Sequence, residues 1–284
     1  MIFYIERKKY PDGSIYAELI NELSENESGI KFRAYNKEFL VASFSIRNYE
    51  DLFFLASAID VLRHNLSSNL KIGICFNFVL SQQHDRRFDK NQSFELKNVC
   101  NFINSLKIDA VGVFSPHSDV LCALLDNYTD GYDKDIFSRF FDKVLENIAS
   151  SEKENLVIVT PDAGAYKRFF RYFPNFDKYP VVSANKYRGI DGKPNVSLDL
   201  SQFQWKNYLI IDDICVNGGT FIELFKEIYK YTDDDYNTIN LAVCNFSHEN
   251  PSKELEQFSR IFTTNGNVQN VNLDNIKILK IEEL

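Results

Sequence analysis

Apolar segments and amphipathic segments alternate along most of the chain. Five leucine and isoleucine residues between 52 and 66 recur at intervals of three and four, which is the period of one face of an α-helix. Short apolar runs on either side, at 39–44 and 71–79, have the length of buried strands. Strands separated by helices are typical of βαβ units, so the pattern predicts an α/β fold with mostly parallel sheets.

The same pattern divides the chain into two blocks. The expected strands are 39–44, 71–79, 110–114, 156–160, 181–184, 208–211 and 239–243. The expected helices are one that contains 52–66, one at 93–106 capped by Ser93, one from about 119, and others at 136–149, 166–173 and 221–229. A polar, turn-rich stretch at 127–135 separates the blocks. We therefore expect two tandem α/β domains, 1–132 and 133–284, each with a mostly parallel sheet flanked by helices.

Composition and charge narrow the class of protein. The 284 residues are 44% hydrophobic and 25% charged, as in a soluble globular protein. The sequence has no apolar run of about 18 residues and no secretory signal at its start, so we expect a cytoplasmic protein without a membrane partner. The net charge of −8 argues against a nucleic-acid partner, which needs a clustered basic surface. It does not exclude a phosphorylated small molecule.

The strongest chemical signal follows the apolar run at 208–211. Two adjacent carboxylates, Asp212 and Asp213, precede a Gly-Gly-Thr turn at 218–220 that opens a helix. Glycines let the backbone approach closely, and the N–H groups, the hydroxyl and the helix dipole then converge on one point, which suits a phosphate. The carboxylates can accept hydrogen bonds from a sugar diol. The segment therefore fits a ribose 5-phosphate, and an acidic turn that caps a helix is the alternative.

This segment resembles the ribose-phosphate loop of the type I phosphoribosyltransferase fold. Four further segments are similar, in the same order, to segments of the ribose-phosphate pyrophosphokinases: Tyr-Pro-Asp-Gly at 10–13, Gln-His-Asp-Arg-Arg at 83–87, Ser-Pro-His-Ser at 115–118 and the run that ends in Pro-Asp-Ala-Gly-Ala-Tyr-Lys-Arg at 161–168. The resemblance covers nearly the whole chain. It implies two phosphoribosyltransferase-like domains, the first with the ATP side and oligomer contacts, the second with the ribose-phosphate loop.

The resemblance also implies an activity. The diphosphate of ATP would pass to the C1 hydroxyl of a ribose 5-phosphate unit, with release of AMP and with Mg²⁺ as cofactor. Lys186 and Arg188 would be catalytic, on a flexible loop where residues two apart point the same way. His117 and Asp162 would bind the metal. Taken alone, the cations fit an ordinary exposed basic hairpin better than a catalytic role. His117 could equally neighbour a helix N-cap, and Asp162 could cap a helix.

The binding residues carried over by the resemblance form two sets. The ribose-phosphate set is Asp212, Asp213, Val216, Asn217, Gly218, Gly219 and Thr220. The ATP set is Tyr10, Asp12, Gln83, His84, Asp85, Arg86 and His117. Aromatic and polar side chains of this kind suit a purine ring. The resemblance implies that Tyr10, Asp12 and Ser14 reach the site of a neighbouring subunit, so we expect a homo-oligomer, at least a dimer.

Several positions depart from the family pattern. Val216 and Asn217 stand where the phosphate loop has Asp-Thr, and Ser115, Gln83, His84 and Ser14 replace Asp, Arg, Gln and Glu. The loss of a carboxylate and a hydroxyl changes the rim of the phosphate loop. This motivates the hypothesis that the acceptor is a ribose whose 5-phosphate carries a further group, such as ADP-ribose.

Other activities remain open. A phosphoribosyltransferase shares the Asp-Asp loop but lacks the duplicated domain, and a catalytically silent regulatory homologue would fit the substitutions but not the retained cations. A nucleic-acid-binding regulator would need a basic appended domain. Lys167 and Arg168 are interpreted as a solvated or packing face of a helix. His64 and His248 match nothing in the family pattern and are expected to be structural or exposed.

Overall fold

The computed structural model describes residues 2–23, 28–35, 38–66, 70–172, 178–188, 194–204, 206–232 and 237–284. The chain divides into two compact units, Met1–Asp133 and Lys134–Leu284. This division falls one residue after the boundary expected from the sequence. Within the described ranges, no helix has both the length and the apolar character that a membrane span requires.

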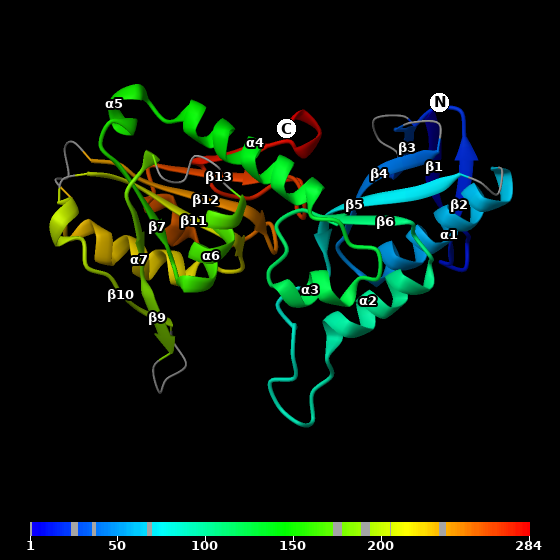
Figure 1. The fold of residues 1–284 in the computed structure, drawn as a ribbon, viewed down its shortest axis with the longest axis horizontal. Helices are drawn as coiled ribbons and strands as arrows, with labels where there is room; N and C mark the ends of the chain where they lie inside the picture. The colour runs from blue at the N-terminus through cyan, green and yellow to red at the C-terminus, as the bar shows by residue number, and fades with distance from the viewer. Residues whose placement is uncertain are drawn as a thin grey trace. The chain divides into compact units, whose positions relative to one another are not determined.

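The first unit is built on a mixed six-stranded sheet (Figure 1). Its elements are β1 (Ile2–Lys9), β2 (Ile15–Ile20), β3 (Gly29–Ala34), β4 (Phe39–Ile46), α1 (Tyr49–Asn65), β5 (Lys71–Val79), α2 (Glu95–Ser105), β6 (Ala110–Val113) and α3 (Asp119–Leu124). The strand order is β2-β1-β3-β4-β5-β6, and β4, β5 and β6 are parallel as predicted. The first three strands pair antiparallel and were not predicted. Most of their positions are only half-buried or exposed, which weakens the apolar pattern.

The two long helices of this unit begin in different ways. Asn48 caps α1 by accepting the Asp51 N–H at 3.0 Å, and Asp51 accepts the Asn48 N–H in return, which forms a capping box. The predicted cap at Ser93 is wrong. The helix begins two residues later at Glu95, and the Ser93 hydroxyl donates to the Glu95 side chain at 3.0 Å instead of accepting a backbone N–H.

The second unit is built on a fully parallel six-stranded sheet. Its elements are α4 (Gly131–Asn147), α5 (Ser150–Lys153), β7 (Leu156–Thr160), α6 (Ala163–Tyr172), β8 (Val181–Ser183), β9 (Asn185–Arg188), β10 (Pro194–Ser197), η2 (Ser201–Phe203), β11 (Asn207–Cys215), α7 (Gly219–Tyr229), β12 (Ile239–Phe246), η3 (Lys253–Gln257), β13 (Arg260–Thr264), β14 (Ile276–Leu279) and η4 (Ile281–Glu283). The strand order is β14-β13-β12-β11-β7-β8, and β9 and β10 form a separate hairpin.

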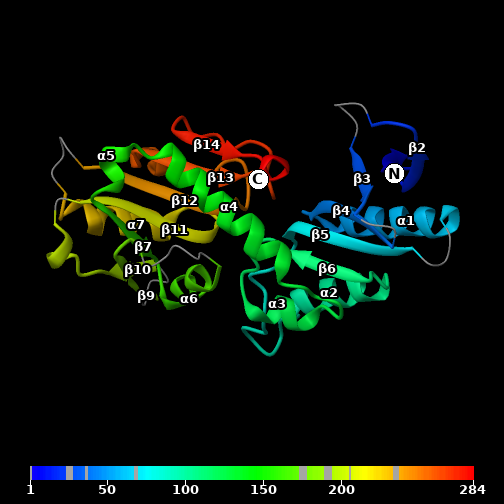
Figure 2. The same cartoon turned by 45° about the horizontal axis from the view of Figure 1, so that its top comes forward.

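Helices cover both faces of this parallel sheet (Figure 2). On one face, Phe141 of α4 packs against Phe169 of α6, with ring centroids 4.4 Å apart. On the other face, α7 buries Phe221 and Leu224 in a core that includes Val157 and Ile210 from the sheet. Strands covered on both faces read as continuous apolar runs, which is why β7 and the first part of β11 were predicted correctly.

Candidate active site

The two adjacent carboxylates lie inside β11, at the carboxyl edge of the parallel sheet. The sequence predicted that the strand ends at Ile211, and this is wrong. The pairing of β11 with β7 ends at Ile210, but β12 continues to pair with β11 as far as Cys215. Asp212 and Asp213 therefore lie in a strand that has a neighbour on one side only, which leaves their other side open to α6.

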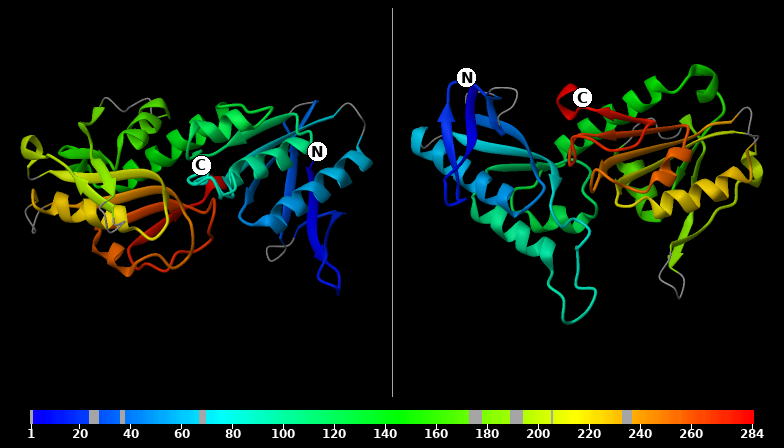
Figure 3. Two further views of the ribbon diagram at one scale, coloured as in Figure 1. Left: turned by 90° about the horizontal axis from the view of Figure 1, so that it is seen from below. Right: turned by 180° about the vertical axis from the view of Figure 1, so that it is seen from behind.

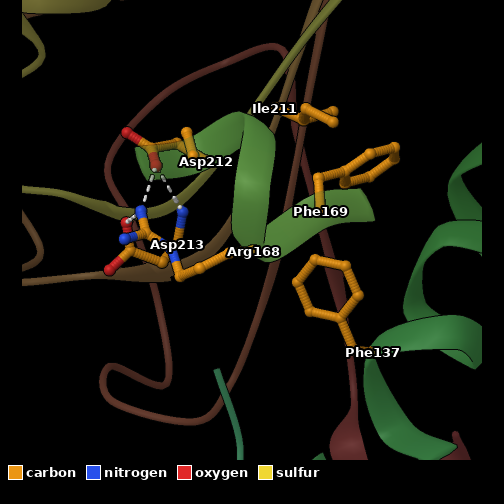
Figure 4. A pocket seen from close by; sticks show the side chains of 7 residues that line it. Phe137, Arg168, Phe169, Ile211, Asp212 and Asp213 are labelled. Atoms are coloured by element: carbon orange, nitrogen blue, oxygen red, sulfur yellow. Dashed lines mark hydrogen bonds and ion pairs between the residues drawn. The ribbon is translucent and has the colours of Figure 1, made fainter. Parts of the chain in front are cut away.

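Arg168 of α6 occupies that open side and binds both carboxylates (Figure 4). Its Nη2 donates to Asp212 Oδ1 at 3.1 Å and to Asp213 Oδ1 at 2.8 Å. The side chains of Arg168, Asp212 and Asp213 are 24%, 14% and 5% exposed, so the three charges meet with little water around them. Of the two interpretations of this position, a solvated or a packing face, the solvated one is wrong, because Arg168 is largely buried and packs against the acid pair. The sequence could have indicated its role only if β7 had been known to neighbour β11.

The charges in this cluster shift one another's titration. Burial raises the pKa of Asp212 well above its usual value, and repulsion from Asp213 adds to the increase, while Arg168 opposes it. Burial lowers the pKa of Arg168, but attraction to Asp213, Asp212 and Asp162 outweighs burial, and the net shift is upward. Carboxyl groups perturbed by burial together with a specific partner are typical of functional sites.

A small pocket borders this cluster. Phe137, Ala165, Phe169 and Ile211 line its apolar side, and Arg168 and the two acids line its polar side (Figure 4). Its volume of about 10 Å³ is no more than a single water molecule needs. The Arg168 side chain therefore leaves almost no free volume beside the acids on the α6 side.

Asp162 lies immediately after β7, at the same edge of the sheet. Its Oδ1 accepts the Ala165 N–H at 2.9 Å, so it caps α6, which is the alternative that the sequence left open. This bond occupies one of its two carboxylate oxygens. Among the described residues, no three His, Cys, Asp or Glu side chains gather closely enough to hold a metal ion. A metal role for Asp162 stays a prediction.

The Gly-Gly-Thr turn positions the start of α7. Gly218 has φ +90°, which favours glycine, and a Cβ there would lie 2.8 Å from the Leu255 side chain. The helix begins at Gly219, so the N–H groups of its first turn have no partner within the helix and are available to an anion. Val216 and Asn217 are exposed and form the rim of this loop, next to β12.

His248 contacts the rim of the phosphate loop, which the sequence did not predict. Its Nε2 lies 2.8 Å from Asn217 Oδ1. The contact arises because His248 follows β12, the parallel neighbour of β11, so both carboxyl-end loops emerge at one edge. The Ser252 N–H also donates to the Asn217 carbonyl at 3.2 Å. The expectation that His248 is structural or merely exposed misses this contact.

The predicted catalytic pair lies on a hairpin that starts at the same edge. Lys186 and Arg188 belong to β9, and their backbones pair with Val196 and Pro194 of β10. The hairpin projects from the parallel sheet (Figures 1 and 3). Just before β9, the Ala184 N–H donates to the Thr160 carbonyl at the end of β7, at 2.8 Å. The predicted mobile turn at 189–193 lies outside the described residues.

The N-terminal members of the ATP set lie in the exposed turn between β1 and β2. Tyr10 is 54% exposed, and its ring packs against the Tyr16 ring at an angle of 30°, with centroids 4.5 Å apart. Asp12 accepts hydrogen bonds from the Ser14 hydroxyl at 2.7 Å and the Ser14 N–H at 2.9 Å. These bonds, the hydroxyl first, lower the pKa of Asp12. The turn is open to solvent on this chain.

The other members of the ATP set lie in two loops at the carboxyl edge of the first sheet. Gln83, His84, Asp85 and Arg86 belong to the long loop at 80–94 that precedes α2 (Figure 3). The His117 N–H donates to Oε1 of the buried Gln82 at 3.1 Å, which brings the loop that carries His117 against the 80–94 loop. The structure therefore brings these two predicted segments together.

Comparisons with known proteins bear on both units. No protein-family model matches the chain. It is 23% identical over 239 residues to a ribose-phosphate pyrophosphokinase of Methanobrevibacter smithii, covering 80% of this chain and 74% of that protein. It is 21% identical over 264 residues to one of Sulfurisphaera tokodaii, covering 92% and 84%. The chain is a distant homologue of the ribose-phosphate pyrophosphokinases.

The fold agrees with this relationship. The crystal structure of a phosphoribosylpyrophosphate synthetase from Mycobacterium smegmatis superposes with a TM-score of 0.71 at 15% identity, covering 98% of this chain and 86% of that one. The prediction of two tandem α/β domains of the phosphoribosyltransferase type is confirmed. The relatives' reaction and substrates are proposals for this chain and are taken up below.

The raised pKa of Asp212 predicts a pH-dependent effect of the substitution Asp212→Asn. A carboxyl group whose folded-state pKa lies above its ordinary value of 3.8 binds its proton more tightly in the folded state. The free energy of unfolding of the wild type therefore falls as the pH rises from 3.8 through the folded-state pKa. Asparagine does not titrate, so the variant does not show this decrease. We expect the stability of the variant relative to the wild type, measured by thermal unfolding, to rise as the pH is raised above about 4. A difference independent of pH would contradict this assignment.

Proposed function

We propose that the chain transfers the diphosphate of ATP to the C1 hydroxyl of a ribose 5-phosphate unit and releases AMP. One observation supports the proposal: the acid pair of β11 and the N-terminus of α7 lie at one sheet edge, five residues apart between Asp213 and Gly218. A ribose 5-phosphate carries a diol for the acid pair and a phosphate for the start of the helix. The distant homology to the ribose-phosphate pyrophosphokinases supports this reaction.

The acceptor would be held by its two ends. Its phosphate would accept hydrogen bonds from the N–H groups of 218–220 and from the Thr220 hydroxyl. Its ring hydroxyls would donate to Asp212 and Asp213. These hydroxyls would have to compete with the Arg168 guanidinium, which donates to the same carboxylates. Fixing both ends would place the C1 hydroxyl in a defined position, and positioning supplies a large part of the rate of such transfers.

The transfer would proceed in one step. The oxygen of the C1 hydroxyl attacks the β-phosphorus of ATP, the bond from that phosphorus to the bridging oxygen of the α-phosphate breaks, and AMP leaves with the electron pair. The hydroxyl gives up its proton, and no covalent bond to the protein forms. Lys186 and Arg188 would stabilise the charge on the transferred diphosphate.

Mg²⁺ would enter with ATP and neutralise part of the charge of its phosphates. Asp162 offers a carboxylate oxygen beyond the one that caps α6, and an oxygen ligand of this kind suits Mg²⁺. His117 would contact the ATP phosphates or their metal. Ser115, whose N–H is bound by the buried carboxylate of Asp133 at 2.7 Å, supplies no carboxylate to this loop.

The adenine would bind to the first unit. The exposed loop at 83–86 offers amide, imidazole and guanidinium groups for the purine edge, and Tyr10 offers an aromatic face. Because Tyr10 and Asp12 lie in a solvent-exposed turn, they would serve the site of a neighbouring copy of the chain. The proposed active form is therefore a homo-oligomer.

Product analysis tests the reaction. The protein is incubated with ATP, Mg²⁺ and either ribose 5-phosphate or ADP-ribose, and the products are weighed by mass spectrometry. We expect two products in equal amounts: AMP, and the acceptor with an added diphosphate. The departures at Val216 and Asn217 favour ADP-ribose as the better acceptor. Transfer to ribose 5-phosphate alone would reject the larger acceptor and leave the reaction type intact.

Two outcomes would point to the other candidate functions. A phosphoribosyltransferase would release no AMP and would need an added base. A silent homologue would form no product with either acceptor, although it could still bind ATP. Absence of AMP with both acceptors would therefore overturn the proposed reaction.

A further inference from the structure

The contact between His248 and the phosphate loop fixes the imidazole tautomer. The Asn250 N–H donates to His248 Nδ1 at 3.3 Å, so Nδ1 is an acceptor and carries no proton. The proton of the neutral ring therefore resides on Nε2, which donates to Asn217 Oδ1 at 2.8 Å. This orients the Asn217 amide in one way, with its oxygen toward His248.

The orientation of Asn217 has a chemical consequence for the rim. With Oδ1 engaged, the two N–H donors of its Nδ2 point away from the imidazole, on an exposed side chain next to Gly218. Backbone hydrogen bonds hold this arrangement in place: the Ser252 N–H binds the Asn217 carbonyl, and the Asn272 N–H binds the Glu249 carbonyl at 2.8 Å. The rim thus presents an oriented, uncharged donor pair beside the start of α7.

The charge of the rim fits a second phosphate. Val216, 40% exposed, adds no carboxylate to the loop beside Asn217. A phosphate monoester ends inside the loop, whereas a 5-phosphate that belongs to a diphosphate continues outward past the rim. A negative group emerging there would meet N–H donors from Asn217 and no repulsion from position 216.

We propose that Asn217, oriented by His248, recognises the second phosphate of an acceptor whose 5-phosphate is part of a diphosphate. His248 acts through Asn217 and is a positioning residue for specificity. This inference rests on the proposed function, because it assumes that Gly218–Thr220 hold the phosphate nearest the ribose. It adds the pair of residues that selects between ribose 5-phosphate and a diphosphate-linked ribose.

Steady-state kinetics with both acceptors test the pair. In the variant His248→Ala, the amide of Asn217 loses its orientation, and we expect KM for ADP-ribose to rise about tenfold, as for the loss of a charge-assisted hydrogen bond. KM for ribose 5-phosphate should rise several times less, and kcat for ADP-ribose should stay within about twofold. His248→Gln, whose amide can still donate to Asn217, should recover most of the selectivity. His64→Ala, at an exposed histidine near the end of α1, is the matched control and should leave both KM values unchanged.

Calorimetric binding of the two acceptors to the wild type and to His248→Ala separates this inference from the proposed function. Selective binding of ADP-ribose that is lost in His248→Ala, without turnover of either acceptor, would reject the reaction and retain the specificity site. Turnover with equal losses for both acceptors in His248→Ala, or with no loss for either, would overturn the specificity site and retain the reaction.

Discussion

Replacing Lys186 with alanine is expected to lower the rate of diphosphate transfer by about 10²- to 10³-fold, the usual effect of removing one group that stabilises charge in the transition state. The proposed reaction develops charge on the oxygens of the transferred diphosphate, and a cation on β9 would offset it. The Ala184 N–H is bonded to the end of β7, and Lys186 follows two residues later. The strand that carries Lys186 therefore begins at the same sheet edge as Asp162. The measurement is AMP formation at saturating ATP and acceptor.

The control for this prediction is Lys226→Ala. Lys226 is 53% exposed on α7 and pairs with Glu223 one turn away at 2.7 Å, so its loss should leave the rate within about twofold. Equal rates for the wild type, Lys186→Ala and Lys226→Ala would show that the hairpin takes no part in transfer. In a silent homologue, Lys186→Ala would change nothing measurable.

Replacing Arg168 with methionine is expected to lower the free energy of unfolding by about 3 kcal/mol at neutral pH, the scale for removing one partner of a buried ion pair. Methionine keeps an unbranched side chain against Phe169 and Ala165 but removes the guanidinium that bridges Asp212 and Asp213. Loss of the guanidinium removes the attraction that lowers the pKa of Asp212, so its pKa rises further and protonation at low pH relieves the repulsion between the two carboxylates. The deficit should therefore shrink as the pH falls toward about 5. Chemical denaturation at several pH values measures it.

Two further variants isolate the cause of this loss. Adding Asp213→Asn to Arg168→Met removes one of the two charges and should recover most of the stability. Arg139→Met deletes an arginine that is 57% exposed and pairs with Asp135 at 3.1 Å, so its effect should be small. If Arg168→Met proved no less stable than Arg139→Met, the ion pair with Asp212 and Asp213 would not contribute to stability.

The acid pair also illustrates why a functional site can oppose stability. Asp212 is held in a place where burial raises its pKa, and Arg168 only partly compensates. A ligand diol that replaces the guanidinium would restore hydrogen bonds to both carboxylates. In the proposed function, Arg168 would stabilise the acid pair before the acceptor binds and would then compete with the acceptor for the carboxylates.

The local pattern of the sequence was sufficient for several elements and for the phosphate loop. The strand Lys71–Val79 was predicted to the residue, because its nine residues are rich in β-branched and aromatic side chains and have the length of a buried strand. Gly218 was predicted to permit close approach, and it has both a positive φ and a near contact with Leu255. These features depend on residues adjacent in the chain, whose steric and hydrogen-bonding preferences act without knowledge of the rest of the fold.

Tertiary structure alone decided which distant groups meet the acid pair and the rim. Arg168 reaches Asp212 across 44 positions of sequence because β7 lies beside β11, and His248 reaches Asn217 across 31 positions because β12 lies on its other side. The order of strands in a sheet depends on how the whole set of apolar faces packs, and no short segment encodes it. The sequence was therefore sufficient to predict the acid pair and the Gly-Gly-Thr turn. That Arg168 contacts the acids and that His248 contacts Asn217 depended on the order of strands in the folded sheet.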